Sequence, residues 1–195
     1  MTPDATATVD SLLPIEIRPE RGHDPAEVVA ITEVVTAAFG SDFEGGLPAA
    51  IRASTNYIPE SALVAVHDGR IVGHVMIAYV ILRADDGQGR RVASLSPLAV
   101  APDVQGRGVG RALVRAVVAV AESRGEPLVV LEGSPRYYGA LGFEHSVPRG
   151  ISITLPEWAP PEAAQLIRLS AYDPAITGTV VYPEYFEESP NERDV

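Results

Sequence analysis

The stretch LAVAPDVQGRGVGR, residues 98–111, changes from an apolar strand pattern into a glycine-rich turn and then into a helical pattern. Backbone amides in the first turn of a helix have no partner within the helix and point outward. Glycines allow an anion to approach these amides closely, and the helix dipole adds positive potential there. The stretch therefore predicts a binding site for a ligand that carries phosphate groups.

The spacing of the glycines excludes two common nucleotide-binding motifs. The last glycine or alanine of a dinucleotide fingerprint would fall on Arg111 or on Leu113, depending on the register. A P-loop would need lysine followed by serine or threonine at the positions of Arg111 and Ala112. Neither motif fits, so the phosphate ligand is expected to be of another kind.

The pattern that fits is Gln-x-x-Gly-x-Gly, formed by Gln105, Gly108 and Gly110 directly after an apolar strand. With this pattern the chain resembles the GNAT superfamily of acetyl-CoA-dependent N-acetyltransferases, and more narrowly its YhbS-like predicted bacterial members. The resemblance extends over most of the chain, although only residues 97–111 and 132–143 carry specific motifs. It implies acetyl-CoA as the cosubstrate.

The resemblance also implies which residues bind coenzyme A. The exposed backbone of Leu98 and Val100 would pair with pantetheine like an added strand, and the amides of residues 106–111 would hold the pyrophosphate. The predicted cofactor-binding residues are Leu98, Ala99, Val100, Gln105, Gly106, Arg107, Gly108, Val109, Gly110 and Arg111.

Three arginines recur at four-residue spacing, at Arg107, Arg111 and Arg115. They could flank the phosphates, or they could form the solvated side of an amphipathic helix. Phosphate proximity is favoured for Arg107 and Arg111. The solvated side is favoured for Arg115, because the effects of a helix terminus fade within one turn.

The second specific motif, EGSPRYYGALGF, occupies residues 132–143. By the resemblance, Tyr138, four residues before Gly142, lies near the sulfur and protonates the departing thiolate. The alternative is a half-buried aromatic residue that only closes the edge of the sheet. Tyr137 is expected to pack, because adjacent residues on a helix point in different directions.

A catalytic base is also needed, because an amine that attacks a thioester releases a proton. Glu132, at the end of an apolar strand, is the candidate for deprotonating the amine through water or for holding its cationic form. A surface carboxylate without a catalytic role explains Glu132 almost as well.

The Leu98 backbone is the candidate donor to the thioester oxygen. His74 and His145 rank lower as bases, since they lack spaced partners, and no residue cluster has metal-ligand spacing.

The composition excludes several classes of protein. The chain of 195 residues has no cysteine, which removes disulfides, zinc-thiolate sites and thiol nucleophiles. Its formal charge of -11 opposes binding to nucleic acid or to anionic membranes. The acidity either favours a cationic substrate or only maintains solubility. No stretch approaches the roughly 18 apolar residues of a spanning helix, and the start lacks a signal-peptide pattern, so we expect a cytoplasmic protein.

Hydrophobic periodicity predicts an alternation of strands and helices. One helix begins at Asp24-Pro25-Ala26-Glu27, with an N-cap, a first-turn proline and a capping-box acid, and ends at Gly40. Pro97 predicts a bulge or splay in its strand, because proline cannot donate to a regular ladder. The other expected elements are a strand near 15–17, a loop or short helix at 41–52, a hairpin of 62–66 and 71–82, a strand at 92–100, a helix from 109 to 124, a strand at 128–131, a short helix at 135–141 and a strand ending at 180–182.

This order of elements predicts a mixed sheet with helices on its faces, the α/β (α+β) class. The resemblance implies the GNAT fold, with about six or seven strands and about four helices. The expected organisation is a flexible arm at 1–12, a single N-acetyltransferase domain at 13–186 and an acidic flexible tail at 187–195. Sheet edges near the C-terminus could pair two subunits, so a homodimer is one option.

The leading hypothesis is an N-acetyltransferase that moves an acetyl group from acetyl-CoA to a primary amine of a small molecule or peptide. The amine would attack directly within a ternary complex. A non-catalytic acyl-CoA-binding sensor would keep the glycine turn without transfer chemistry, and an adaptor domain would use the turn only as a connection. Polyamines, antibiotics, amino acids and protein N-termini all stay open as acceptors.

Overall fold

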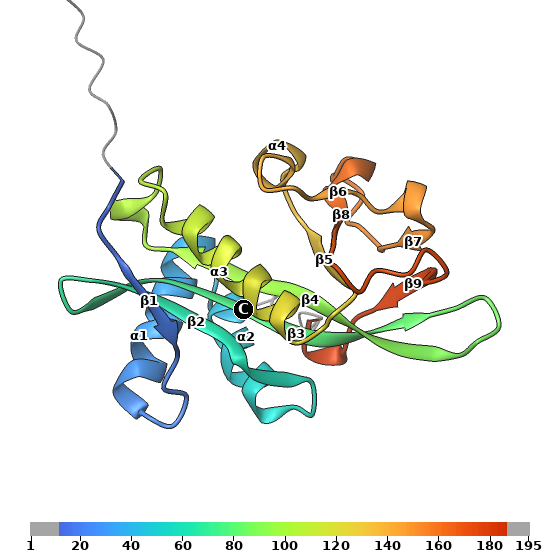
Figure 1. Ribbon diagram of the computed structural model, residues 1–195. Coiled ribbons are helices and arrows are strands. Elements are labelled where there is room, and N and C mark those ends of the chain that lie inside the picture. Colours follow the sequence, from blue (N-terminus) through green and yellow to red (C-terminus); the bar gives the residue numbers. More distant parts are fainter. Residues whose placement is uncertain (1–11, 187–195) are drawn as a thin grey trace, which may run out of the picture.

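The computed structural model describes residues 12–186, and their strands form one sheet of nine strands (Figure 1). The strand order is β1-β2-β3-β4-β5-β8-β6, with β9 beside β3 and β7 beside β9. The strands are β1 (Glu16–Pro19), β2 (Tyr57–His67), β3 (Arg70–Arg83), β4 (Gly89–Val100), β5 (Leu128–Glu132), β6 (Glu144–His145), β7 (Ile151–Ser152), β8 (Ala164–Arg168) and β9 (Gly178–Val181). The α-helices are α1 (Pro25–Phe39), α2 (Asp42–Ala53), α3 (Val109–Ser123) and α4 (Pro135–Gly139). Short 3-10 helices are η1 (Pro102–Val104), η2 (Val147–Arg149), η3 (Pro161–Ala163) and η4 (Glu184–Phe186).

The described residues have the mixed α/β architecture that the sequence predicts. Their paired strands are antiparallel except for β4–β5 and β7–β9, which are parallel. α3 connects β4 to β5, since a parallel pair needs a crossover connection. The sheet has nine strands rather than the predicted six or seven. The additional strands β6 and β7 contain two residues each, too few to show an alternating pattern.

Helices cover both faces of the sheet (Figure 1). On one face, Leu113 of α3 belongs to the same buried apolar cluster as Val75 of β3. On the other face, Ile51 of α2 is buried with Met76 of β3, and Ile31 of α1 lies in a neighbouring cluster. Val75 and Met76 are adjacent in β3, so their side chains point to opposite faces and anchor different helices.

The predicted boundaries of the first helix are confirmed, but one of its start signals is wrong. α1 has Asp24 as its N-cap and Gly40 as its C-cap, with a left-handed φ of 72° at Gly40. The Asp24 side chain accepts a hydrogen bond from the Ala26 N–H at 3.0 Å. Glu27 is no capping-box residue, because its buried carboxylate pairs with the Arg18 guanidinium at 2.7 Å instead. The long-range ion pair outweighs the local cap.

The region 41–52, predicted to be a loop or a short helix, belongs to the twelve-residue helix α2. Leu47 and Ile51 are buried on its inner side. Gly45 lies directly against the Thr36 side chain of α1, where any larger residue would collide with it. Gly45 therefore allows close helix packing, and neither Gly45 nor Gly46 breaks the helix.

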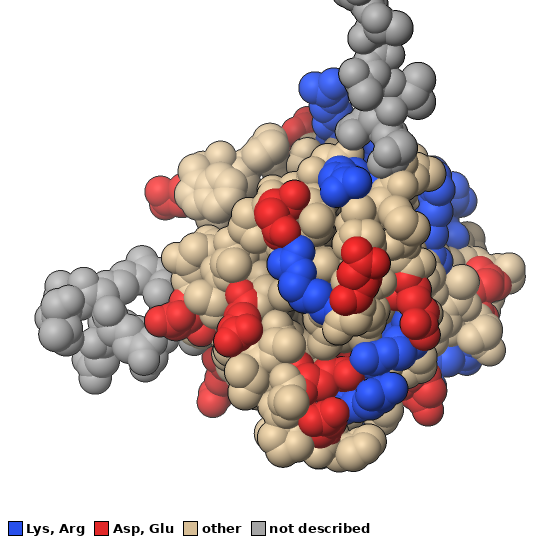
Figure 2. Space-filling model, turned by 90° about the vertical axis from the view of Figure 1, so that its left-hand side faces the viewer, with Lys and Arg blue, Asp and Glu red and all other residues tan. Residues whose placement is uncertain are grey.

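Acidic and basic side chains are interspersed on the face shown in Figure 2. That face carries no large patch of one sign, so the net charge of -11 is not concentrated there. No helix within residues 12–186 is long and apolar enough to cross a membrane. The predicted arm before Leu12 and the predicted acidic tail lie outside the described residues.

Candidate active site

β4 and β5 diverge in the middle of the sheet. They pair only at Ala93–Val129 and Ser94–Val130. No further residue pair joins these two strands in the described part of the chain, although β4 continues to Val100. One edge of the second half of β4 is therefore open.

A bulge accompanies this divergence at the predicted position. Leu95 pairs with Ile77 and Leu98 pairs with Val75, so β4 advances three residues while β3 advances two. The extra residue lies beside Pro97, which cannot donate to the ladder. The predicted irregularity at Pro97 is confirmed.

The open edge of β4 carries backbone groups of Leu98 and Val100. The Ala101 N–H donates to the Val72 carbonyl of β3 at 2.9 Å. Because successive backbone groups of a strand alternate between its two edges, the N–H groups of Leu98 and Val100 point away from β3. The Gln105 side chain donates to the Val100 carbonyl at 3.0 Å, which ties the glycine turn to this edge.

Ala99 differs from its two neighbours in β4. By the same alternation its N–H lies on the β3 edge, and its side chain is buried in the cluster around Ile31 of α1. The prediction that Ala99 contacts the cofactor directly is therefore not supported by this geometry. Leu98 and Val100 are the strand residues whose backbone N–H groups lie at the open edge.

The glycine-rich turn folds as the sequence predicts, between β4 and the N-terminus of α3. Gly106 and Gly108 have φ angles of 77° and 85°, in the left-handed region that favours glycine. Gly108 precedes α3 as its N-cap, so the unpaired amides of the first turn border a groove of about 760 Å³. The turn contributes Gln105, Gly106, Gly108, Val109, Gly110 and Arg111 to the lining of this groove.

The three arginines of this region lie in different surroundings. Arg111 lines the groove. Arg107 does not belong to the groove lining, and its backbone carbonyl accepts a hydrogen bond from the Leu13 N–H at 3.2 Å. Arg115 is exposed one turn further along α3, as expected. The groove therefore gains the guanidinium of Arg111, and the predicted role of Arg107 lacks support.

Tyr137 and Tyr138 on α4 occupy different environments. The Tyr137 hydroxyl lies so close to Gly110 that a methyl group there would be 2.6 Å from it. Tyr137 is expected to pack, and in addition it contributes to the lining of the groove. The Tyr138 ring lies over Gly133 and edge-on to Phe143, with 5.5 Å between ring centroids. Burial raises the pKa of Tyr138, so this phenol is protonated at neutral pH.

A second pocket, of about 720 Å³, borders the same divergence between β4 and β5. Its wall includes Leu95 and Ser96 of β4 and Glu132 at the end of β5. We call it the Glu132 pocket. The remainder of its wall comes from the loop 154–156, from residues 179–182 and from Phe186.

Glu132 is accessible to solvent at the wall of this pocket. Desolvation by the surrounding protein raises the pKa of the Glu132 carboxyl, and the nearby Tyr182 hydroxyl opposes this increase. A carboxylate has several acceptor sites, so Glu132 keeps hydrogen-bonding capacity for another molecule. Glu132 is therefore more than a plain surface carboxylate, because it faces a pocket beside the open strand edge.

The chain matches the family model described as Acetyltransferase (GNAT) family over residues 28–143, more than half of its length. It is 33% identical over 122 residues to the Uncharacterized N-acetyltransferase YjhQ of Escherichia coli K12, covering 62% of this chain and 66% of YjhQ. The chain belongs to the GNAT family of acetyltransferases. It is also 26% identical over 164 residues to the Uncharacterized N-acetyltransferase YhbS of the same organism, covering 83% of this chain and 94% of YhbS.

Two solved GNAT structures resemble this one closely. The crystal structure of Escherichia coli YhbS in complex with CoA gives a TM-score of 0.76 at 29% identity, covering 89% of this chain and 92% of that one. A GNAT acetyltransferase from Brucella melitensis in complex with acetyl-CoA gives a TM-score of 0.70 at 27% identity, covering 89% and 99%. The GNAT fold and the acetyltransferase class expected from the sequence are confirmed.

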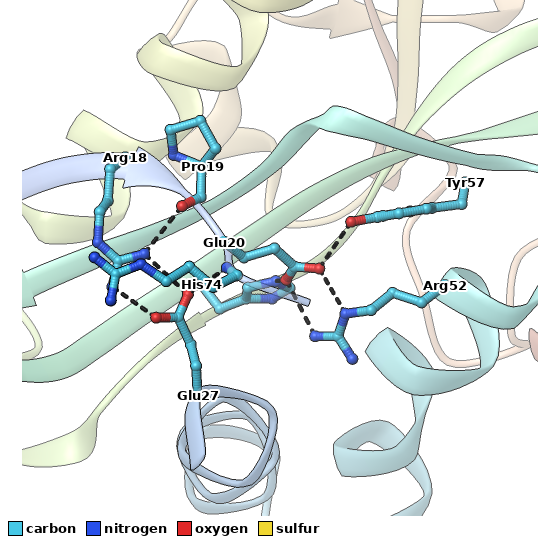
Figure 3. Close-up of polar contacts among 8 residues, drawn as sticks. Arg18, Pro19, Glu20, Glu27, Arg52, Tyr57 and His74 are labelled. Atoms are coloured by element: carbon cyan, nitrogen blue, oxygen red, sulfur yellow. Dashed lines mark hydrogen bonds and ion pairs between the residues drawn. The ribbon is translucent and has the colours of Figure 1, made fainter. Parts of the chain in front are cut away.

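His74 belongs to a buried cluster on another part of this GNAT fold, around the carboxylate of Glu20 (Figure 3). Three groups surround the carboxylate oxygens of Glu20. Nε2 of His74 lies 2.9 Å from one of them, Nε of Arg52 lies 2.5 Å from the other, and the Tyr57 hydroxyl lies 3.0 Å from that same oxygen. Neither the Glu20 nor the His74 side chain has exposed surface. Burial alone would raise the pKa of Glu20, but hydrogen bonds from His74 and Arg52 lower it to about 2. We call these four residues the Glu20 cluster.

The two histidines considered as bases are not brought to the GNAT site. His74 is fully buried, and burial lowers its pKa, so it stays neutral and out of contact with substrate. His145 in β6 lines neither of the two pockets. Within residues 12–186, no group of three or more His, Asp or Glu side chains could hold a metal ion.

Sequence reasoning missed three parts of the site, namely Tyr182, Phe186 and the loop 154–156. Tyr182 follows Glu132 by 50 residues, and the pairing of β9 with β3 brings it to the wall of the same pocket. The only local signal was that Tyr182 ended a predicted strand. No periodicity connects such distant positions.

Proposed function

We propose that this GNAT protein transfers the acetyl group of acetyl-CoA to a primary amine of a small molecule or peptide by direct attack in a ternary complex. One observation supports this most strongly: the groove at the glycine turn and the Glu132 pocket border the same divergence of β4 from β5. A thioester lying along Leu98 and Val100 would therefore approach an amine held near Glu132. YhbS and the Brucella protein, solved with CoA and acetyl-CoA, support the same cosubstrate here.

The groove fits coenzyme A in two respects. Unpaired amides at the start of α3 suit a pyrophosphate, and the free N–H groups of Leu98 and Val100 suit the amides of pantetheine. Gly108 packs closely against the Leu12 side chain, since a methyl group at Gly108 would lie 2.6 Å from Leu12. Arg111 adds positive charge, and the Tyr137 hydroxyl adds a donor near Gly110.

In the proposed reaction, the neutral amine attacks the thioester carbonyl carbon, a C–N bond forms and the C–S bond breaks. Glu132 accepts the proton released by nitrogen, through a water molecule. Tyr138 donates its proton to the departing sulfur, which its raised pKa and its place in the motif support. The Leu98 N–H stabilises the developing charge on the carbonyl oxygen. The products are the N-acetylated amine and free CoA.

Calorimetry with acetyl-CoA, followed by thiol release across an amine panel, tests this function. Binding with turnover on at least one amine is the expected outcome. Binding without turnover on any amine favours a non-catalytic acyl-CoA sensor, and no binding at all favours an adaptor domain. Gly108→Glu should abolish acetyl-CoA binding, because the bulk and charge of the new side chain oppose a pyrophosphate. Retained affinity for acetyl-CoA would contradict the proposed pyrophosphate site at the glycine turn.

Tyr138→Phe tests the acid role with Tyr137→Phe as its matched control. Loss of the Tyr138 hydroxyl should lower kcat roughly 10- to 100-fold with unchanged acetyl-CoA affinity. Loss of the Tyr137 hydroxyl should mainly weaken cofactor affinity, because that hydroxyl lies at the glycine turn. Unchanged kcat across pH in Tyr138→Phe would remove Tyr138 from the acid role.

The organisation of the protein is part of the proposal. We infer a single catalytic domain over residues 13–186 and a cytoplasmic protein that acts without nucleic acid or membrane partners. β6 is the last strand of the sheet order, and this sheet edge supports a homodimer. Light scattering of the purified chain tests the dimer, for which a monomer mass would be the contrary result.

A further inference from the structure

The Glu132 pocket has an apolar and aromatic wall. Tyr182 and Phe186 lie together with 5.1 Å between their ring centroids, and Phe186 also contacts Tyr185 at 5.0 Å. Leu95 and Leu155 extend the apolar surface. Aromatic ring faces attract organic cations as well as apolar groups. The wall therefore suits an ammonium group carried on a hydrophobic body.

The described wall of this pocket carries a single charged side chain. Among the described residues that line it, Glu132 is the one Asp, Glu, Lys or Arg side chain. The other polar side chains are the hydroxyls of Ser96, Thr154, Thr179 and Tyr182. One carboxylate can neutralise one ammonium group. A second ammonium would lose hydration against apolar walls, and a carboxylate would face Glu132 without a compensating cation.

The size of the pocket points to a small acceptor. Its volume of about 720 Å³ falls in the range of about 300–1,000 Å³ typical of small-molecule sites. Glu132 lies at the strand divergence, and Phe186 and the loop 154–156 form other parts of the wall. The reacting nitrogen would thus sit near Glu132 and the body of the molecule among the apolar residues.

On the basis of the acetyltransferase function proposed above, we infer that the acceptor is a small monoamine with an alkyl or arylalkyl body. Free amino acids and polyamines carry one charge more than the described residues of the pocket wall can pair. Glu132 and the aromatic pair Tyr182–Phe186 are then specificity-determining residues. The inference narrows the acceptors that the sequence leaves open to one chemical class.

Trp158 offers a binding signal that does not depend on turnover. It is the single tryptophan of the chain, its side chain is 85% exposed, and it lies two residues after Pro156 of the pocket wall. Two residues span at most about 7 Å, so the Trp158 backbone lies near Pro156 of the pocket wall. An acceptor that enters the pocket should change the Trp158 fluorescence.

Two matched pairs of amines test the inference, each differing by one charged group. The pairs are 2-phenylethylamine with phenylalanine, and hexylamine with 1,6-diaminohexane. With acetyl-CoA, kcat/KM should be at least about tenfold higher for the monoamine of each pair, because an unpaired or like charge is costly in this pocket. With CoA, Trp158 fluorescence should report the same order of affinities.

Thr154→Arg adds a cation to the pocket wall, and Thr154→Gln is its uncharged control. The arginine variant should raise the phenylalanine to phenylethylamine ratio of kcat/KM about tenfold, whereas the glutamine variant should leave it unchanged. Such a gain does not depend on the loss of any catalytic group. An unchanged ratio in Thr154→Arg would count against the inference.

The outcomes separate this inference from the proposed function. Turnover of both members of each pair at similar rates overturns the monoamine preference and leaves acetyl transfer intact. Fluorescence discrimination without any turnover supports the monoamine pocket and overturns the proposed reaction. Absence of both turnover and fluorescence change, with acetyl-CoA bound, overturns the pocket as the acceptor site.

Discussion

Glu20, which follows β1, and Glu132, which ends β5, are two glutamates with opposite environments. Glu20 has no exposed surface and accepts hydrogen bonds from His74, Arg52 and Tyr57 (Figure 3). Glu132 is solvent-accessible at a pocket wall. Tyr182 is the residue that lowers its pKa, against the effect of desolvation. The pKa of Glu20 is lowered to about 2, and that of Glu132 is raised.

The difference teaches that burial alone does not determine the state of a carboxyl group. Desolvation disfavours the charged form of both residues, and the number of charged and neutral donors decides the outcome. Glu20 is saturated by its donors, so it holds β1, β2, β3 and α2 together. Glu132 is left with free acceptor capacity, which suits proton transfer and cation binding.

The largest expected effect is a loss of stability in Glu20→Ala. Removing this carboxylate leaves Arg52 buried beside neutral His74, and breaking a buried pair in this way costs about 3–5 kcal/mol of unfolding free energy. Urea denaturation measures it. Glu132→Ala is the control and should change stability by less than about 1 kcal/mol. Equal losses in both variants would contradict the proposed division of roles.

Acid should destabilise the protein chiefly through the Glu20 cluster. Glu20 and His74 both have folded pKa values below their ordinary values of 4.5 and 6.5. Their stabilisation is therefore present above those values and is lost as pH falls, first through His74 and then through Glu20. The Glu20 contribution, from 4.5 to about 2, is about 3 kcal/mol.

Urea midpoints between pH 7 and pH 3 measure this acid sensitivity. Glu20→Gln should flatten the curve below pH 4.5, because the titrating group is gone. Glu132 has a raised pKa and contributes with the opposite sign, so Glu132→Gln should leave the acid decline in place. A decline that survives in Glu20→Gln would assign the acid sensitivity to other groups.

Glu132→Gln should lower kcat/KM about 100-fold with unchanged affinity for acetyl-CoA, because the amine loses its base. A base acts in its deprotonated form, so wild-type activity should rise with pH through the raised pKa of Glu132. This acid limb should disappear in the variant. Initial rates from pH 5 to pH 9 measure it, and an unaltered acid limb would assign the base to another group.

Tyr182→Phe should have the smallest effect, a two- to fivefold loss of kcat/KM near pH 6 and little change near pH 8. The Tyr182 hydroxyl lowers the pKa of Glu132, so its removal should shift the acid limb to higher pH. Tyr57→Phe removes the corresponding hydroxyl from Glu20. It should cost about 1–2 kcal/mol of stability and leave the pH profile of activity unchanged.

The features predicted correctly from the sequence depend on neighbouring residues. Gly106 and Gly108 adopt left-handed backbone angles at the start of α3, and Pro97 coincides with a bulge. Asp24 and Gly40 bound α1 because caps act within a few residues. The features that were missed or wrong depend on distant residues: Glu27 pairs with Arg18, and Tyr137 reaches Gly110.

The candidate site divides in the same way. The glycine turn and the tyrosine motif could be recognised, because their residues are close in the chain and their spacing is specific. The Glu132 pocket could not, because Tyr182 and the loop 154–156 reach it only through the pairing of β9 with β3 and β7.

By itself, the sequence determined the family, the α/β class and the position of the phosphate-binding turn, since these follow from backbone geometry over a few consecutive residues. Only the tertiary structure decided that Glu20 is saturated while Glu132 stays available. The physical reason is that a carboxylate's pKa depends on the donors and solvent around it, and strand pairing brings those donors from distant segments. Residue type alone is the same at both positions.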